Sequence, residues 1–150
     1  LTKILAIPGL RLGYIVTNAE LTKKLLKYKI PWSVNSVALK VGEKGIGLKD
    51  FFRATAEFVK KERVRIISSL SKIHGLRCIN SCANFILIEL TSKIASTECQ
   101  KQLLLRNNIL VRDCITFRGI GNRCIRIGLK GQKENDLLVS ALRGLMETLQ

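Results

Sequence analysis

In the first half of the chain, apolar residues recur three or four positions apart, the spacing that places them on one face of a helix. We expect Pro31 to end the first of these helices and Gly75 to act as the C-cap of the last. Residues 10–18 are instead rich in β-branched and aromatic residues, which predicts a strand. The expected helices cover residues 19–30, 34–44 and 49–73.

From residue 76 onward, short apolar runs alternate with turn residues and with two helical patterns. The order strand, strand, helix, strand, strand, helix describes a compact α+β domain. We therefore divide the chain into the edge of a larger domain over 1–48, a long connecting helix over 49–75 and a small α+β domain over 76–150. In the small domain, the expected strands cover 76–80, 84–90, 109–114 and 123–129, and the expected helices cover 96–106 and 132–150.

The composition is typical of a soluble globular protein. Hydrophobic residues make up 47% of the chain, but no apolar run approaches the roughly 18 residues of a membrane helix. The N-terminus lacks the charged-then-apolar layout of a signal peptide. The five cysteines show no C-x-x-C spacing, so we expect reduced thiols, no metal site and a cytoplasmic location, with a zinc site at Cys78 and Cys82 as the weaker alternative.

The net charge of +15 indicates an anionic partner. Nucleic acid, an acidic membrane and phosphorylated small molecules all meet this requirement, although the solvated faces of helices account for part of the charge. Aromatic residues form only 5% of the chain, which argues against a base-stacking surface. The glycine-rich residues 42–47 lack the Lys-Ser or Lys-Thr of a phosphate-binding loop. We therefore expect a phosphorylated small molecule as partner and no membrane, with nucleic acid as the weaker alternative.

Lys3 is the first candidate for chemistry. A lysine near a terminus is usually solvated, but the apolar run over residues 4–7 is expected to desolvate this amine and make it a nucleophile. Pro8 and Gly9 predict a turn, after which Arg11 brings a permanent positive charge back toward the amine. An amine beside an arginine suits a cofactor that carries both an aldehyde and a phosphate.

These opening residues, LTKILAIPGLRLG, resemble the lysine signature of fold-type-I pyridoxal-phosphate enzymes of the class I and II aminotransferase group. After the lysine, that signature has a small residue, a glycine, an arginine and a second glycine, which the chain matches with Ala6, Gly9, Arg11 and Gly13. The resemblance implies an α/β fold. This chain is then the C-terminal part of a fold-type-I transferase, comprising the edge of its large domain and its small α+β C-terminal domain.

The same resemblance implies a cofactor, pyridoxal 5′-phosphate, and roles for two residues. Lys3 is the catalytic residue and binds the cofactor covalently, while Arg11 binds the cofactor phosphate. The family's residues that contact the cofactor ring lie upstream of the signature, so we expect this chain to belong to a longer enzyme and to be a poor catalyst alone. The family also implies a homodimer.

Two later stretches resemble the same group. SCANFILIEL is similar to the strand that opens the small domain, and ILVRDCITFRGIGNRCIRIGL is similar to the strand pair that binds the substrate's anionic groups. The resemblance implies that Arg126 binds the substrate carboxylate or its spatial equivalent and that Arg112 binds the substrate phosphate. From the residues alone, an arginine in an apolar strand fits a buried ion pair equally well.

Within the group, PWSVN at residues 31–35 and the segment VRDCITFRG are more similar to the threonine-phosphate decarboxylases of cobalamin synthesis than to the histidinol-phosphate aminotransferases. We therefore expect a decarboxylase whose product is 1-amino-2-propanol phosphate, with the transaminase as the alternative. A third interpretation comes from another class: a stand-alone basic domain whose anion- or nucleic-acid-binding surface consists of Arg112, Arg118, Arg123 and Arg126.

Overall fold

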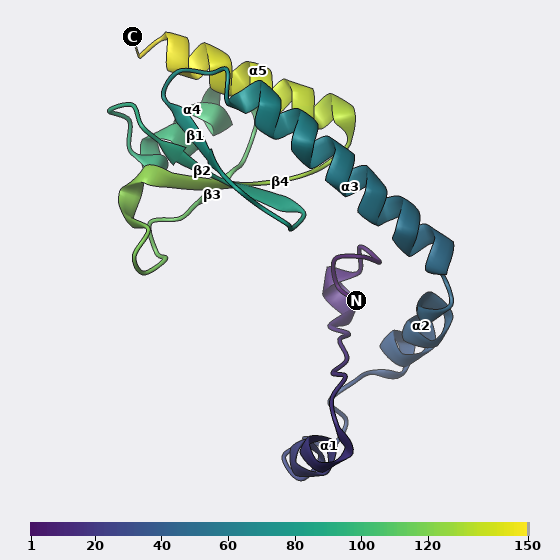
Figure 1. Ribbon diagram of the computed structural model, residues 1–150. Helices are drawn as coiled ribbons and strands as arrows, with labels where there is room; N and C mark the ends of the chain where they lie inside the picture. The colour runs from purple at the N-terminus through teal and green to yellow at the C-terminus, as the bar shows by residue number, and fades with distance from the viewer. Residues whose placement is uncertain (150) are drawn as a thin grey trace. The chain divides into compact units, whose positions relative to one another are not determined.

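The computed structural model describes residues 1–149, which pack as two compact units divided between Ala56 and Glu57 (Figure 1). The first unit contains a 3₁₀ turn over Pro8–Leu10, helix α1 (Ala19–Leu26) and helix α2 (Ser36–Ile46). Helix α3 (Lys49–Leu70) begins in the first unit and ends in the second. Among residues 1–149, no helix is long and apolar enough to cross a membrane.

Asparagine side chains set the starts of both helices of the first unit. Asn18 accepts a hydrogen bond from the Leu21 N–H at 2.8 Å, and Asn35 accepts one from the Ala38 N–H at 2.8 Å. Such N-caps satisfy donors that lack a partner inside the helix. The cap at Asn35 explains why α2 begins at Ser36, two positions after the predicted start. The helix continues to Ile46, two positions beyond its predicted end at residue 44.

The strand predicted over residues 10–18 is wrong. Leu10 ends the 3₁₀ turn, residues 11–18 have no regular secondary structure, and no described residue forms a ladder with them. The β-branched composition favours an extended chain, but a strand also requires backbone partners on a neighbouring strand. Helix α1 likewise ends at Leu26 instead of at Pro31, because its last turn tightens into bonds between residues three positions apart.

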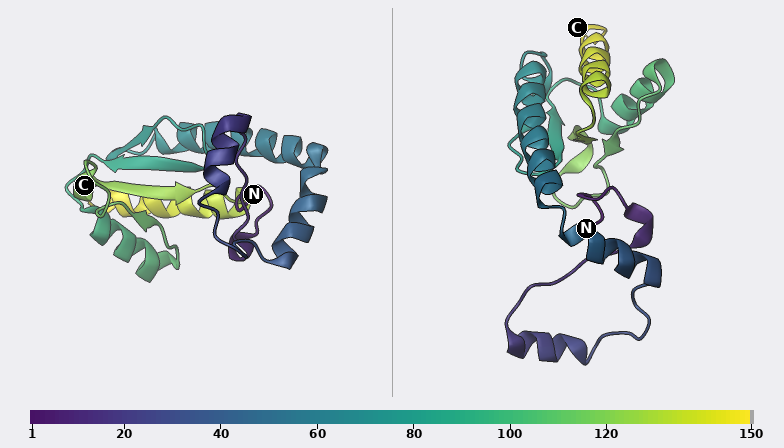
Figure 2. Two further views of the ribbon diagram at one scale, coloured as in Figure 1. Left: turned by 90° about the horizontal axis from the view of Figure 1, so that it is seen from below. Right: turned by 90° about the vertical axis from the view of Figure 1, so that its right-hand side faces the viewer.

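The second unit has a four-stranded antiparallel sheet in the order β1-β2-β4-β3 (Figures 1 and 2). Its core is formed by one face of the sheet and by α3, α4 and α5, while alternate residues of β2 and β4 point to the other face, which these helices leave uncovered. The elements are β1 (Leu76–Ile79), β2 (Phe85–Leu90), α4 (Ser96–Asn107), β3 (Arg112–Asp113), β4 (Cys124–Gly128) and α5 (Gln132–Glu147).

The elements of the second unit follow the prediction closely, with two corrections. Strand β3 has two residues instead of six, because the chain leaving α4 is held outside the ladder, where the Gln100 amide donates to the Val111 carbonyl at 2.7 Å. Helix α3 ends at Leu70, and Gly75 lies in the following turn instead of capping the helix. Gly75 has φ of 89°, and a Cβ there would lie 3.2 Å from the Ser92 side chain, so the turn requires glycine.

A buried polar network joins α3 to α5 within the second unit. The Glu62 carboxylate accepts from the Arg65 guanidinium at 2.8 and 2.9 Å and from the Asn135 amide at 2.8 Å. The bonds from Arg65 lower the pKa of Glu62 and outweigh the opposing effect of burial. Asn135 also bonds the backbone of Lys130, so the network fixes the start of α5.

Candidate active site

Lys3 lies in a tightly wound loop at the start of the first unit. The carbonyl of Leu1 accepts from the Leu5 N–H at 3.1 Å, that of Thr2 accepts from the Ile7 N–H at 3.1 Å, and that of Lys3 accepts from the Ala6 N–H. The Lys3 side chain is exposed. The loop therefore holds the backbone around the amine and leaves the amine accessible.

Two glycines of α2 let this loop pack against the helix. A Cβ at Gly45 would lie 2.7 Å from Leu5 Cδ1, and a Cβ at Gly42 would lie 2.8 Å from Leu12 Cδ2. The glycine-rich segment thus has a packing role that sequence reasoning missed. Within the expected apolar run, Leu5 packs against α2, and Lys3 is exposed, so the described residues do not enclose Lys3 as the sequence predicted.

Arg11 adopts a left-handed conformation, with φ of 54° and ψ of 50°, which non-glycine residues rarely do. Its guanidinium turns back along the chain and donates to the Pro8 carbonyl at 2.9 Å. No described carboxylate pairs with it. An accessible amine and an unpaired guanidinium on one loop fit a cofactor with an aldehyde and a phosphate, so these two residues fit pyridoxal phosphate.

Arg112 and Arg126 are brought together by the register of the sheet. They lie directly opposite each other on β3 and β4, which places them on the same sheet face. Arg77 and Glu89, also directly opposite on this sheet, form an ion pair, whereas Arg112 and Arg126 carry the same charge. Because like charges in this arrangement destabilise a sheet, the pair is suited to bind an anion between or beside its guanidinium groups.

Asp113 is the acidic residue next to this pair in sequence, but other groups occupy its carboxylate. The Ser96 and Thr97 hydroxyls each donate to it at 2.7 Å, and the Ile115 N–H donates at 3.0 Å. Burial alone raises the pKa of Asp113, but these hydrogen bonds outweigh it and hold the pKa below its usual value. No described carboxylate forms an ion pair with Arg112 or Arg126.

Each arginine of the pair lies over an aromatic ring. The Arg126 guanidinium carbon is 5.0 Å from the centre of the Phe85 ring, and that of Arg112 is 5.5 Å from the centre of the Phe117 ring. Arg112 also donates to the Thr116 hydroxyl at 3.2 Å. Sequence reasoning did not single out these phenylalanines, because nothing local indicates which ring lies against which arginine.

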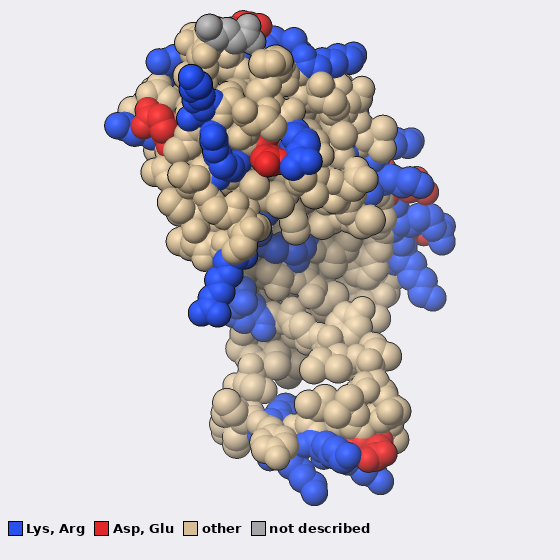
Figure 3. Space-filling view, turned by 60° about the vertical axis from the view of Figure 1, so that its left-hand side comes forward, with Lys and Arg blue, Asp and Glu red and all other residues tan. Residues whose placement is uncertain are grey.

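The structure does not gather the four arginines proposed as one basic surface. Arg123 donates to the Ser92 carbonyl instead of facing the Arg112–Arg126 pair, and Arg118 is exposed in the loop between β3 and β4. On the face shown in Figure 3, Lys and Arg side chains are scattered among other residues. Of the predicted site residues, Lys3 and Arg11 share the loop of the first unit, and Arg112 and Arg126 share the sheet of the second.

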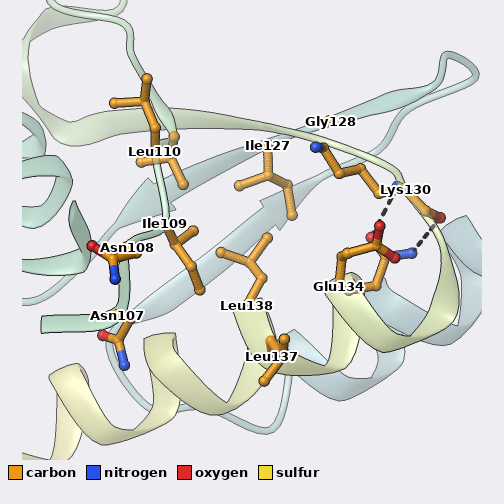
Figure 4. Close-up of a pocket in the computed structure, with 12 residues that line it drawn as sticks. Asn107, Asn108, Ile109, Leu110, Ile127, Gly128, Lys130, Glu134, Leu137 and Leu138 are labelled. Carbon is orange, nitrogen blue, oxygen red and sulfur yellow. Dashed lines mark hydrogen bonds between the residues drawn. The ribbon is translucent and has the colours of Figure 1, made fainter.

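A pocket of about 410 Å³ lies elsewhere in the second unit, between the end of α4, β4 and the start of α5 (Figure 4). Its apolar lining includes Leu110, Leu137 and Leu138, and its buried amide, Asn135, already bonds the Lys130 backbone and Glu62. None of the predicted site residues lines it. The candidate functional residues therefore form two groups, the lysine loop in the first unit and the arginine pair in the second.

Comparison with known proteins gives a family match over most of the chain. The family described as aminotransferase class I and II matches residues 1–142. The chain is 35% identical over 150 residues to a histidinol-phosphate aminotransferase of Thermoanaerobacter pseudethanolicus, covering 97% of the chain and 40% of that protein. It is 31% identical over 147 residues to a threonine-phosphate decarboxylase of Salmonella typhimurium, again covering 97% of the chain and 40% of the relative.

A solved structure shows the same fold. The crystal structure of L-threonine-O-3-phosphate decarboxylase from Porphyromonas gingivalis superposes with a TM-score of 0.87 at 29% identity, covering 97% of this chain and 45% of that one. The chain thus spans about two fifths of the length of these two curated relatives. With its lysine loop, paired arginines and mixed α/β fold, this chain belongs to the class I and II aminotransferases, a family of fold-type-I, pyridoxal-phosphate-dependent enzymes.

Proposed function

We propose that the protein that contains this chain is a threonine-phosphate decarboxylase. The observation that carries this proposal is the pair of opposing guanidiniums, Arg112 and Arg126, without a carboxylate partner among the described residues. Threonine phosphate has a phosphate and a carboxylate, so it offers an anion to each arginine. Histidinol phosphate has a phosphate but no carboxylate, so a transaminase would use the second guanidinium only for the carboxylate of its keto-acid partner.

In this proposal the chain's own residues bind and orient the substrate and move a proton. When bound, pyridoxal phosphate supplies an electron sink for the bond that breaks at the substrate's α-carbon. Lys3 holds the cofactor through its amine, and Arg11 neutralises the cofactor phosphate. Arg126 orients the substrate carboxylate so that the bond to CO₂ is the one that breaks, and Arg112 binds the substrate phosphate. The Lys3 amine then returns a proton to the α-carbon.

The runner-up activity is that of a histidinol-phosphate aminotransferase, which the 35% identical relative favours. In that reaction Lys3 acts as a general base and removes the α-hydrogen, while Arg112 keeps its role toward the phosphate. The two activities therefore differ in what Arg126 binds and in which bond to the α-carbon is oriented for cleavage.

We further propose that the enzyme is a cytoplasmic homodimer. All five cysteines are free thiols in the structure, which agrees with a reducing compartment. Tyr28 and Trp32 are among the large apolar side chains that the first unit leaves exposed, the latter at 96%. Apolar surface of this extent favours burial against more protein, which a dimer provides.

The full-length protein, loaded with pyridoxal phosphate, tests the activity with both substrates. We expect CO₂ release from threonine phosphate, and we expect Arg126→Gln to lower kcat/KM for this substrate about 10- to 100-fold, the range for a lost charge-assisted hydrogen bond. Arg112→Gln is expected to lower kcat/KM for either phosphorylated substrate. Turnover of histidinol phosphate with a keto acid, without CO₂ release from threonine phosphate, contradicts the proposal.

A further inference from the structure

We propose that Phe85 and Phe117 are positioning residues, which hold Arg126 and Arg112 in place as two separate anion-binding groups. This inference rests on the proposed function, in which each guanidinium binds a different group of one substrate. According to this inference, the two rings contribute to substrate binding and not to packing of the hydrophobic core. Both rings are more than one third exposed, and neither belongs to the hydrophobic core of the second unit.

The sheet register explains how Phe85 reaches Arg126. The residue directly opposite Phe85 is Gly128, and Arg126 lies diagonally across, two positions earlier on β4. A Cβ at Gly128 would meet no atom within 4 Å, so no side chain competes for the space beside the ring. Diagonal neighbours across antiparallel strands are within reach of aromatic side chains. The ring face therefore lies 5.0 Å from the guanidinium carbon.

The loop after β3 places the second ring. The Phe117 N–H donates to the Cys114 carbonyl at 2.9 Å, and the Phe117 carbonyl accepts from the Ile120 N–H at 3.3 Å. These turns bring the chain back so that the Phe117 ring lies 5.5 Å from the Arg112 guanidinium carbon, with the Thr116 hydroxyl as an additional acceptor. Arg112 is thus held by two residues of its own loop.

Electrostatics gives the rings their effect. The face of an aromatic ring carries partial negative charge and attracts a guanidinium. A carboxylate accepts hydrogen bonds from the N–H groups at the edge of the guanidinium, whereas a ring beneath its plane does not. A carboxylate in the same place would neutralise the arginine and compete with the substrate. Two rings therefore hold two like charges near each other, while the N–H groups of Arg126, and those of Arg112 that do not bond Thr116, remain available for an anion.

The test uses the full-length holoenzyme with Phe85→Leu, Phe85→Tyr, Phe117→Leu and Phe117→Tyr. We expect Phe85→Leu to raise KM for threonine phosphate about 3- to 10-fold, as a lost cation–π contact predicts, with kcat and melting temperature nearly unchanged. Phe117→Leu is expected to raise KM for threonine phosphate and for histidinol phosphate alike, whichever of them the enzyme turns over. The tyrosine variants keep the ring and should retain wild-type KM.

Phe58→Leu is the matched control. Phe58 is 47% exposed on α3 and has no arginine over its ring, so its loss should leave KM unchanged. If the leucine variants at 85 and 117 also leave KM unchanged, or if tyrosine fails to restore it, the positioning role is wrong.

A binding measurement separates this inference from the proposed function. Phenylglyoxal modifies free guanidiniums, and inorganic phosphate should protect Arg112 from it, as read by peptide mass. If the wild-type enzyme turns over neither substrate, the proposed function is wrong, but the positioning role of the rings is not affected. Phosphate protection of Arg112 that weakens about threefold in Phe117→Leu still supports the positioning role, and protection equal to wild type overturns it.

Discussion

At the scale of single residues, Asp113 shows how a carboxylate next to an arginine is kept from pairing with it. Its oxygens accept from Ser96, Thr97 and the Ile115 N–H, which ties β3 to the start of α4 and to the following loop. The neighbouring Arg112 and its partner Arg126 then remain available for an external anion. The bonds to Asp113 and the ladder with β4 together hold the short strand β3 in place.

We predict that Asp113→Ala lowers the free energy of unfolding by about 2 kcal/mol at pH 7, since hydrogen bonds to a charged group are lost. The folded pKa of Asp113 is lowered, so its contribution is complete above the ordinary value near 3.8 and is lost as the pH falls through the folded pKa. The difference between wild type and variant should therefore shrink below about pH 4. Urea unfolding at pH 7 and pH 3 measures this, and a constant difference contradicts it.

At the scale of elements, helix α2 shapes the loop that carries Lys3. Its glycines at 42 and 45 let Leu12 and Leu5 approach the helix more closely than any Cβ allows. The helix thereby fixes the loop backbone without burying the lysine. Packing of this kind costs the helix some intrinsic stability, because glycine is a poor helix former.

We predict that Gly45→Val displaces Leu5 and with it the Lys3 loop. Incubation with pyridoxal phosphate, borohydride reduction and peptide mass analysis should locate the pyridoxyl group at Lys3 in the wild type, with several-fold less at Lys3 in the variant. Gly144→Val is the control, because it places the same residue in a helix where a Cβ meets nothing within 4 Å. Equal labelling of Lys3 in both variants, or label spread over many lysines, contradicts the role given to the loop.

At the scale of the whole molecule, the two units differ in how much apolar surface they bury. The second unit has a core in which Ile86, Ile88 and Ile125 are fully buried. In the first unit, α1 has no buried residue at all. Since burial of apolar surface is the main favourable term in folding, the second unit is the more stable of the two in this chain.

Hydrogen exchange of this chain measures that difference. We predict that the amides of residues 13–17, which donate no backbone hydrogen bond in the structure, exchange within the dead time of the experiment. The amides of β2 and β4, bonded in the centre of the sheet, should exchange slowest. Slow exchange at residues 13–17 would show that this segment does pair with a strand.

The sequence by itself determined the family, the lysine signature and most elements of the second unit. These features depend on neighbouring residues: the spacing from Lys3 to Arg11, the short apolar run of β2 and the Asn108 end of α4 are all local. Such local patterns can be read from the sequence because the periodicity of a helix or a strand determines which residues share one face.

Only the tertiary structure decided how distant residues meet. The pairing of Arg112 with Arg126 depends on the register of β3 against β4, and the contact of Phe85 with Arg126 depends on the register of β2 against β4. The prediction of a strand over residues 10–18 is wrong for the same reason, because the sequence pattern of a strand does not specify which segment pairs with it. Register, partners and burial are set by the free energy of packing the chain as a whole, and no short stretch of sequence contains that information.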